Sequence, residues 1–274
     1  MKYTVAFFGT PHFSVPILES LTEEFDIKLV VSQPDKPVGK GRQVAPSAVS
    51  QKAQALGLNV HTPSILKKDT LTPLMQSIDI AVVVAYGKIL PQWLLDLPRF
   101  GAINIHASLL PKYRGASPIS ASILEGNAVT GISYIVMNNK MDEGDIIFQS
   151  ELPIDPTETS GSLAIKLSHS ASNDINNVVY KYISGELVAS PQDESKATYC
   201  SVLSKEDGKI DFEQLPQNLD RMVRAYHPWP GVWGMYNGKR VKLLPGTQVQ
   251  MEGKKATSLA NFKNGYPDFP IDAF

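Results

Sequence analysis

The sequence predicts an α/β protein with a doubly wound parallel sheet, followed by a small β-rich domain at the C-terminus. Short apolar runs alternate with longer mixed segments up to about residue 203. One run, Ile80–Val84, is apolar at every position, as in a parallel strand covered on both faces. After about residue 226 the pattern changes, and Asn237-Gly238 between two short runs is a strong hairpin signal.

The individual elements follow in chain order. Six apolar runs are predicted as strands: Tyr3–Phe8, Ile27–Ser32, Ile78–Ala85, Ala102–His106, Ser133–Met137 and Asp145–Leu152. Two segments are predicted as helices because each is followed by a glycine, and the second carries apolar residues at helical spacing: Ser47–Leu56 and Ser160–Ser184. The hairpin strands are predicted over Val232–Tyr236 and Lys239–Leu244. We therefore divide the chain into an N-terminal domain over 1–203, a linker over 204–211 and a C-terminal domain over 212–274.

Composition narrows the class of protein. The 274 residues are 43% hydrophobic and 19% charged, so a disordered chain is not expected. The net charge is −1, so contact with a nucleic acid would need a local basic patch. The single cysteine, Cys200, excludes a disulfide framework and fits a reducing cytoplasm. The longest apolar run, Ile80 to Tyr86, is too short to cross a bilayer, so we expect a cytoplasmic protein with no membrane partner.

Several common site types are not expected. The first predicted strand leads into Gly9-Thr10-Pro11, which lacks the glycine pattern of a dinucleotide site. The chain contains no phosphate-binding loop of the G-x-x-x-x-G-K-[ST] type. The histidines lack the spacing of a zinc site, and we expect no metal. They are His12, His61, His106, His169 and His227.

The strongest chemical signal is the pair Asn104 and His106 at the end of a predicted strand. Residues two apart in a strand point to the same face, so an amide and an imidazole would lie side by side. Polar groups at the carboxyl ends of buried strands are where open α/β sheets bind ligands. Taken alone, the pair is better explained as polar residues at an exposed strand end.

A second segment favours the functional interpretation. In Met141–Asp145, after the predicted strand Ser133–Met137, two acidic residues are followed by a glycine, which predicts a turn that can bring a carboxylate to His106. A carboxylate fixes the orientation of an imidazole and favours its protonated form. An amide donor, an imidazolium and a carboxylate together suit acyl transfer. No G-x-S-x-G segment is present, so direct transfer is favoured over a covalent intermediate.

These segments resemble the signature of the 10-formyltetrahydrofolate-dependent formyltransferases. The resemblance rests on Asn104-x-His106-x-Ser108-Leu109-Leu110-Pro111, on Tyr113-Arg114-Gly115 and on Asp142-x-Gly144-Asp145. Three further segments resemble the methionyl-tRNA branch of that family: Gln33–Arg42, Leu203–Asp211 and His227–Gly231. The match runs from residue 1 to about 244 and again at Gly253–Lys255.

The resemblance implies a Rossmann-like N-terminal domain and an oligonucleotide-binding β-barrel at the C-terminus. It also implies transfer of a formyl group from 10-formyltetrahydrofolate to the α-amino group of initiator methionyl-tRNA. Asn104, His106 and Asp142 match the catalytic positions of the family. Asn104 and protonated His106 would hold the developing oxyanion, and Asp142 would orient His106. We expect a monomer that uses the folate as co-substrate.

Binding positions are also implied by the resemblance. The folate pocket would be formed by residues of two segments: Tyr86, Gly87, Ile89 and Leu90, then Ser108, Leu109, Leu110 and Pro111. Ordinary packing of the Tyr86 ring is the alternative for that residue. The segment 32–42 has a net charge of +2, and we expect it to be an exposed loop. The resemblance places this segment on the tRNA acceptor end, with Lys36, Lys40 and Arg42 as contacts, and it places Phe13 near the aminoacyl group. The alternative for an isolated basic loop is that it is simply solvated.

The C-terminal part departs from the family pattern. Only about three strand-like runs remain, too few to close a five-stranded barrel, so we expect a shortened domain. Two other functions stay open. One is a sugar-nucleotide N-formyltransferase that uses the same cofactor, and the other is a folate- or RNA-binding module with a decayed site.

Overall fold

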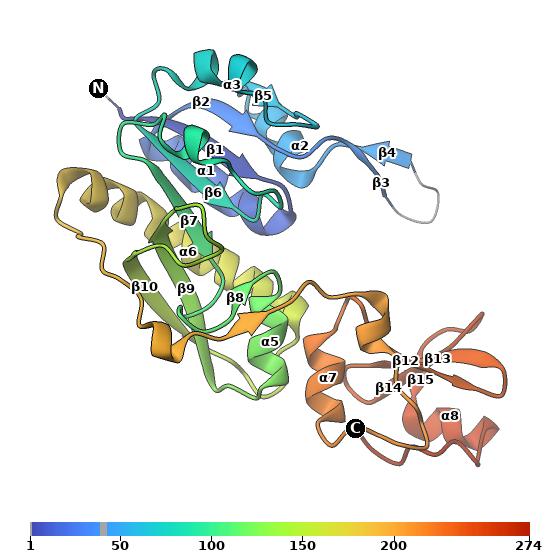
Figure 1. Cartoon of the computed structure of the whole chain (residues 1–274). Helices are drawn as coiled ribbons and strands as arrows, with labels where there is room; N and C mark the ends of the chain where they lie inside the picture. The colour runs from blue at the N-terminus through green and yellow to red at the C-terminus, as the bar shows by residue number, and fades with distance from the viewer. Residues whose placement is uncertain (1, 39–42) are drawn as a thin grey trace. The chain divides into compact units, whose positions relative to one another are not determined.

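The chain forms two compact units. The structure is a computed structural model that describes residues 2–38 and 43–274 (Figure 1). The first unit contains Met1–Arg114, Gly131–Glu151 and Ile165–Thr198, and the second contains Gly115–Thr130, Leu152–Ala164 and Tyr199–Phe274. The units therefore consist of interleaved segments, and the linear domain boundaries at 203 and 211 stay a prediction.

The first unit is built on a sheet with the strand order β10-β9-β7-β6-β1-β2-β5. Its strands are β1 (Thr4–Gly9), β2 (Asp26–Val31), β5 (Val60–His61), β6 (Ile80–Val84), β7 (Ala102–His106), β9 (Val129–Val136) and β10 (Ile146–Pro153). The pairs from β5 to β7 are parallel, and β9 runs antiparallel to β7. All six predicted strands are present. The two-residue strand β5 was not predicted, because so short a run carries no periodicity.

Helices cover both faces of this sheet. On one face, Ala6 and Phe8 pack in a cluster that includes residues of α3 (Lys68–Met75) and α4 (Gln92–Leu95). On the other face, Val5 and Phe7 are equally buried. There α1 (Val15–Glu24) is tied to α6 (Ser160–Ser184) by hydrogen bonds from Asn176 to Ser20. The predicted doubly wound α/β architecture is confirmed.

Both predicted helices are also confirmed. In α2 (Ala48–Ala55) the side chain of Ser47 accepts a hydrogen bond from the backbone of Ser50 and caps the N-terminus. The helix α6 has the predicted bounds. Of its predicted apolar stripe Tyr182 is half-buried, and the other members lie in the core: Leu163, Leu167, Ile175, Val178 and Val179. Further short elements are η1 (His12–Ser14), β3 (Lys36–Val38), β4 (Gln43–Ala45), β8 (Arg114–Gly115), α5 (Pro118–Leu124), η2 (Glu194–Lys196), β11 (Tyr199–Cys200) and η3 (Lys205–Gly208).

The order of the strands locates a ligand-binding edge. From β1 the chain winds outward through β2 to β5, and from β6 it winds the other way to β7. Such a reversal leaves a crevice outside the carboxyl ends of the two central strands. Gly9 at the end of β1 pairs with Val84 at the end of β6, and Val83 pairs with Asn104 of β7. The ends of these three strands therefore meet at one edge.

The second unit contains an antiparallel sheet of the strands β12 (Val232–Tyr236), β13 (Lys239–Leu244), β14 (Gln248–Met251) and β15 (Thr257–Ser258). Two helices accompany it, α7 (Leu219–Ala225) and α8 (Leu259–Gly265). The predicted hairpin is confirmed, because Asn237 and Gly238 both have positive φ in the turn between β12 and β13. The small C-terminal β domain is also confirmed, with the two-residue β15 as an addition.

Two features cover this small sheet. Phe269 is buried, and its ring lies 5.0 to 5.1 Å from the rings of Phe212, Tyr236 and Phe262. At the edge of β12, the backbone of Ile210 donates a hydrogen bond of 2.8 Å to the Trp233 carbonyl. This small sheet thus closes its core with aromatic side chains and pairs part of its open edge. Within residues 2–38 and 43–274, no helix has the length and apolar character needed to span a membrane.

The buried stripe of α6 gives a test of the fold. Leu167 is fully buried whereas Ile165, two residues earlier, is 63% exposed. Leu167→Ala should lower the free energy of unfolding by about 2 to 5 kcal/mol, because it leaves a cavity. Ile165→Ala is the control and should change it by about 0.5 kcal/mol or less. Urea unfolding of the two variants and the parent measures this. Equal effects of the two changes would contradict the placement of the helix.

Candidate active site

Asn104 and His106 lie on the last residues of β7, at the edge where β1 and β6 also end. Asn104 is half-buried, and the His106 side chain is 6% exposed. Their positions two apart on a strand put both side chains on one face, as the sequence predicts. The neighbouring Ile103 and Ile105 are buried in the core.

Asp142 joins this pair from the connection between β9 and β10. Asn104 Nδ2 donates a hydrogen bond of 3.2 Å to Asp142 Oδ1. The distance from His106 Nδ1 to Asp142 Oδ2 is 3.5 Å, and the carboxylate is 14% exposed. The structure thus brings together the three residues predicted as catalytic, although their roles stay a proposal.

The second ring nitrogen of His106 also has a partner. Nε2 lies 2.9 Å from the backbone carbonyl oxygen of Tyr113. A carbonyl only accepts hydrogen bonds, so we assign the proton of this contact to Nε2. Both nitrogens then face oxygen atoms, and an imidazolium would donate through each of them.

The loop after β7 is fastened to the neighbouring strands by polar side chains. Ser133 Oγ donates to the Ser108 carbonyl over 2.6 Å and accepts from the Leu110 backbone over 2.9 Å. Gln149 Nε2 donates to the Leu110 carbonyl over 3.0 Å. Ser133 and Gln149 were not predicted as functional residues, because their only signal in the sequence is a polar residue within a predicted strand.

Strained backbone is concentrated in the loops of this edge. Ala85, Tyr113 and Asp142 have φ values of 46°, 61° and 55°, which are unusual for residues other than glycine. Such conformations persist only where surrounding contacts hold them, and they gather at functional sites. Gly144 is also required, because a Cβ atom there would overlap the carbonyl oxygen of Val136.

The segment predicted to form the folate pocket divides into core and surface residues. The Tyr86 ring is 2% exposed and packs edge-on against Phe8, and Leu90 is buried with it. Gly87 is exposed, and Ile89 is 80% exposed. In the second predicted segment Ser108 and Leu110 are buried, whereas Leu109 and Pro111 are partly accessible. Contact with folate stays a prediction for all of these residues.

The predicted tRNA contacts are described only in part. The segment 32–42, predicted as a loop, contains the strand β3, which pairs with β4 directly after the segment. Lys36 in β3 donates a hydrogen bond of 2.6 Å to Gln33 Oε1, and Gln33 Nε2 donates to the Tyr86 carbonyl over 2.9 Å. Lys40 and Arg42 lie outside the described residues. Phe13 is half-buried in η1, where its carbonyl accepts a hydrogen bond from Ser168.

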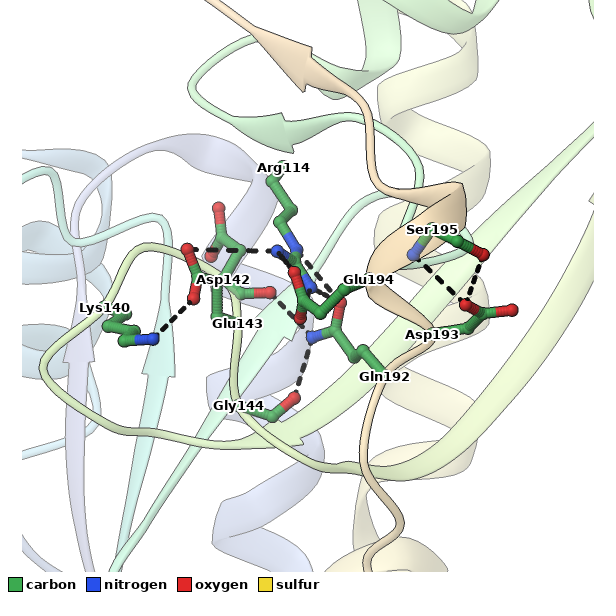
Figure 2. Close-up of polar contacts among 9 residues, drawn as sticks. All are labelled: Arg114, Lys140, Asp142, Glu143, Gly144, Gln192, Asp193, Glu194 and Ser195. Atoms are coloured by element: carbon green, nitrogen blue, oxygen red, sulfur yellow. Dashed lines mark hydrogen bonds and ion pairs between the residues drawn. The ribbon is translucent and has the colours of Figure 1, made fainter.

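A buried arginine network beside Asp142 was not foreseen. Figure 2 shows Arg114 in contact with Gln192 and Glu194, from the segment around η2, and with Glu143 of the Asp142 loop. The Arg114 side chain has no exposed surface. Gln192 and Glu194 lie 78 and 80 residues away along the chain, so no local pattern indicates them. Among the described residues, no group of three or more His, Cys, Asp or Glu side chains is arranged to hold a metal.

Comparison with protein families gives two matches. Residues 1–179 match the family described as Formyl transferase, and residues 202–247 match Formyl transferase, C-terminal domain. Methionyl-tRNA formyltransferase of Koribacter versatilis is 37% identical over 297 aligned positions, which cover 96% of this chain and 95% of the relative. The corresponding protein of Deinococcus radiodurans is 42% identical, with 91% and 79% covered. The first alignment is longer than the 274-residue chain, so it contains positions that this chain lacks.

Solved structures show the same fold at much lower identity. A sugar N-formyltransferase from Shewanella superposes with a TM-score of 0.67 at 17% identity, covering 88% of this chain and 96% of that one. HypX from Aquifex aeolicus in complex with tetrahydrofolic acid gives a TM-score of 0.63 at 13% identity, covering 97% of this chain and 48% of that one.

The buried hydroxyl of Tyr86 provides a test of this region. It has no hydrogen-bond partner among the described residues, and burial raises the pKa of Tyr86 to about 12. Tyr86→Phe should therefore leave stability unchanged or raise it by about 1 kcal/mol at neutral pH. An unfolded tyrosine ionises near pH 10, so the parent should lose stability relative to the variant as the pH rises from about 10 to 12.

Urea unfolding at several pH values measures this difference. Tyr180→Phe is the control at neutral pH, because that side chain is 55% exposed, and it should change the free energy of unfolding by about 0.5 kcal/mol or less. A loss of stability in Tyr86→Phe at neutral pH would mean that the hydroxyl has a partner after all.

Proposed function

Because the chain belongs to the methionyl-tRNA formyltransferase family, we propose that it transfers the formyl group of 10-formyltetrahydrofolate to the α-amino group of initiator methionyl-tRNA. The observation that carries the proposal for this chain is the contact of the Asp142 carboxylate with both Asn104 and His106. These groups stand at the carboxyl edge of the sheet, where α/β proteins bind their ligands.

These side chains can stabilise the oxyanion, orient its donors and help move a proton, and the reaction needs all three. The amine attacks the formyl carbon, the formyl oxygen gains negative charge, and the bond from that carbon to N10 of the folate then breaks. The amine loses a proton, and the departing nitrogen gains one. Asn104 has a second N–H that can face the oxyanion, and a protonated His106 adds a charged donor. Asp142 holds both donors and is placed to help move the amine proton.

The position of His106 adds a condition to this mechanism. Its Nε2 contacts the Tyr113 carbonyl and its Nδ1 faces Asp142. To donate to the formyl oxygen, the imidazole must exchange one of these acceptors for the substrate. We propose that binding of the two substrates brings about this exchange at Tyr113, because the contact with Asp142 is the one that the chemistry requires.

The folate would bind where small and apolar groups are accessible at the same edge. Gly87 and Ile89 are exposed beyond β6, and Leu109 and Pro111 are partly accessible after β7. These residues suit a flat pteridine ring, which needs apolar walls and a few fixed polar groups. The complex of HypX with tetrahydrofolic acid supports a folate ligand for this fold.

The alternative function, a sugar-nucleotide N-formyltransferase, differs from the proposed one in the amine that accepts the formyl group. Sugar N-formyltransferases share the fold at 16 to 18% identity, whereas the methionyl-tRNA enzymes share 34 to 42% of the sequence. The higher similarity favours tRNA. A cytoplasmic location and a monomeric state are the predictions that accompany this function.

Three variants test the chemistry. His106→Ala, Asn104→Ala and Asp142→Asn should each lower kcat by about 10² to 10⁴, as expected for loss of an acid or an oxyanion donor. Asparagine is chosen at 142 because it tolerates the left-handed backbone conformation. Single-turnover formylation assays measure the rates, and thermal unfolding checks the fold. The double variant Asn104→Ala/Asp142→Asn should lose less than the product of the single effects. Near-parental activity of any single variant would remove that residue from the mechanism.

The acceptor is tested by salt dependence. If Lys40 and Arg42 contact tRNA phosphates, replacing both with alanine should lower kcat/KM for methionyl-tRNA and flatten its salt dependence by about 1.4 units of slope. Folate binding should not change. Lys67→Ala/Lys68→Ala is the control, because it removes the same charge from an exposed segment. Salt slopes equal to those of the parent, or a faster reaction with an amino-sugar nucleotide, would favour the alternative acceptor.

A further inference from the structure

Both acceptors that face His106 belong to segments tied to one buried arginine. Tyr113, whose carbonyl faces Nε2, directly precedes Arg114 in the chain. Asp142, whose carboxylate faces Nδ1, belongs to the loop that Arg114 reaches through Gln192. The position of the imidazole therefore depends on residues that do not touch it.

The partners of Arg114 are fixed by its burial. A guanidinium without exposed surface must be paired, because an unpaired buried charge is strongly unfavourable. Its Nη1 and Nη2 donate to the two carboxylate oxygens of Glu194 over 2.9 and 2.7 Å, in a bidentate pair. Hydrogen bonding to this guanidinium lowers the pKa of Glu194. Nε and Nη2 donate to Gln192 Oε1 over 3.1 and 2.8 Å.

This pairing determines the orientation of the Gln192 amide. Arginine only donates, so the oxygen of Gln192 must face it. The amide nitrogen then points the other way and donates to the carbonyls of Asp142 and Gly144, each over 2.7 Å (Figure 2). Gln192 is buried, and a carboxamide is the neutral side chain that has an acceptor on one side and two donors on the other.

We propose that Gln192 is a positioning residue for formyl transfer, which connects Arg114 to the Asp142 loop and aims the Asp142 carboxylate at Asn104 and His106. The inference rests on the proposed function and assigns a further residue to the same site. Asp142 has a φ of 55°, a conformation that its own sequence does not favour. The two hydrogen bonds from Gln192 bind the carbonyls on either side of Glu143 and stabilise that conformation.

The test compares Gln192→Met in two backgrounds. Methionine keeps the length of the side chain and loses all four of the hydrogen bonds described for Gln192. In the parent, kcat for methionyl-tRNA should fall by about 10- to 100-fold, because a small displacement of a reacting group is costly. KM for methionyl-tRNA should change by about twofold or less. In the Asp142→Asn background the same change should cost about threefold or less, because the residue acts through the lost carboxylate.

Two more variants separate positioning from folding. Gln192→Glu keeps an oxygen for Arg114 but has no N–H for the two carbonyls, so it should fold and still lose kcat as Gln192→Met does. Gln51→Met is the control for the substitution, since Gln51 is an exposed residue of α2 bonded only locally to the Pro46 carbonyl in the described contacts, and it should keep parental kcat. A parental kcat for Gln192→Glu would overturn the proposal. So would an equal relative decrease in kcat on Gln192→Met in the parent and in the Asp142→Asn background.

The ring of His106 gives a measurement that does not depend on the acceptor. Nitrogen-15 NMR of the imidazole should show a changed Nδ1 signal in Gln192→Met, because the carboxylate beside it has moved. An unchanged signal would overturn the positioning role. Failure of the parent to formylate methionyl-tRNA would instead count against the proposed function, and the NMR comparison would still decide the role of Gln192.

Discussion

The Asp142 carboxylate accepts a hydrogen bond from Asn104 and lies 3.5 Å from the His106 imidazole, and the candidate site depends on this contact. The strand β7 supplies Asn104 and His106 on a rigid support, but Asp142 comes from a connection between strands. Its backbone is left-handed and needs support from outside the loop. Gly144 lets the loop press against Val136, and Gln192 binds its carbonyls. Packing and hydrogen bonding thus place the carboxylate where local preference alone would not.

The strand order explains why the chemistry is found at this edge. Reversal of the winding between β1 and β6 opens a crevice outside their carboxyl ends, and β7 brings the polar pair to the same level. β9 runs antiparallel to β7 and ends at Val136, which pairs with Ile103 near the start of β7. The connection that carries Asp142 then reaches back along β7 to Asn104 and His106. The fold therefore makes a site from residues almost forty positions apart by using two neighbouring strands.

Much of this arrangement could be predicted from the sequence, because it follows from short periodic patterns. The two-residue period placed Asn104 and His106 on one face, and the acidic turn with its glycine indicated Asp142. The helix Ser160–Ser184 followed from its apolar spacing. The Arg114 network could not be predicted, because its partners are about eighty residues away and lack a local signal. The Tyr86 ring belongs to the core. The sequence could not distinguish this from a place in the folate pocket, because aromatic residues at a strand end occur in both.

In the proposed reaction the formyl group moves directly from folate to the amine of methionyl-tRNA, at the edge formed by Asn104, His106 and Asp142. The most direct measurement is a single turnover of the full chain with 10-formyltetrahydrofolate labelled in the formyl group, quenched at short times. Direct transfer predicts that the label leaves the folate at the same rate as it appears on the α-amine of methionyl-tRNA, with none attached to the protein. Label bound covalently to the protein, or transferred to an amino-sugar nucleotide in preference to the tRNA, would contradict it.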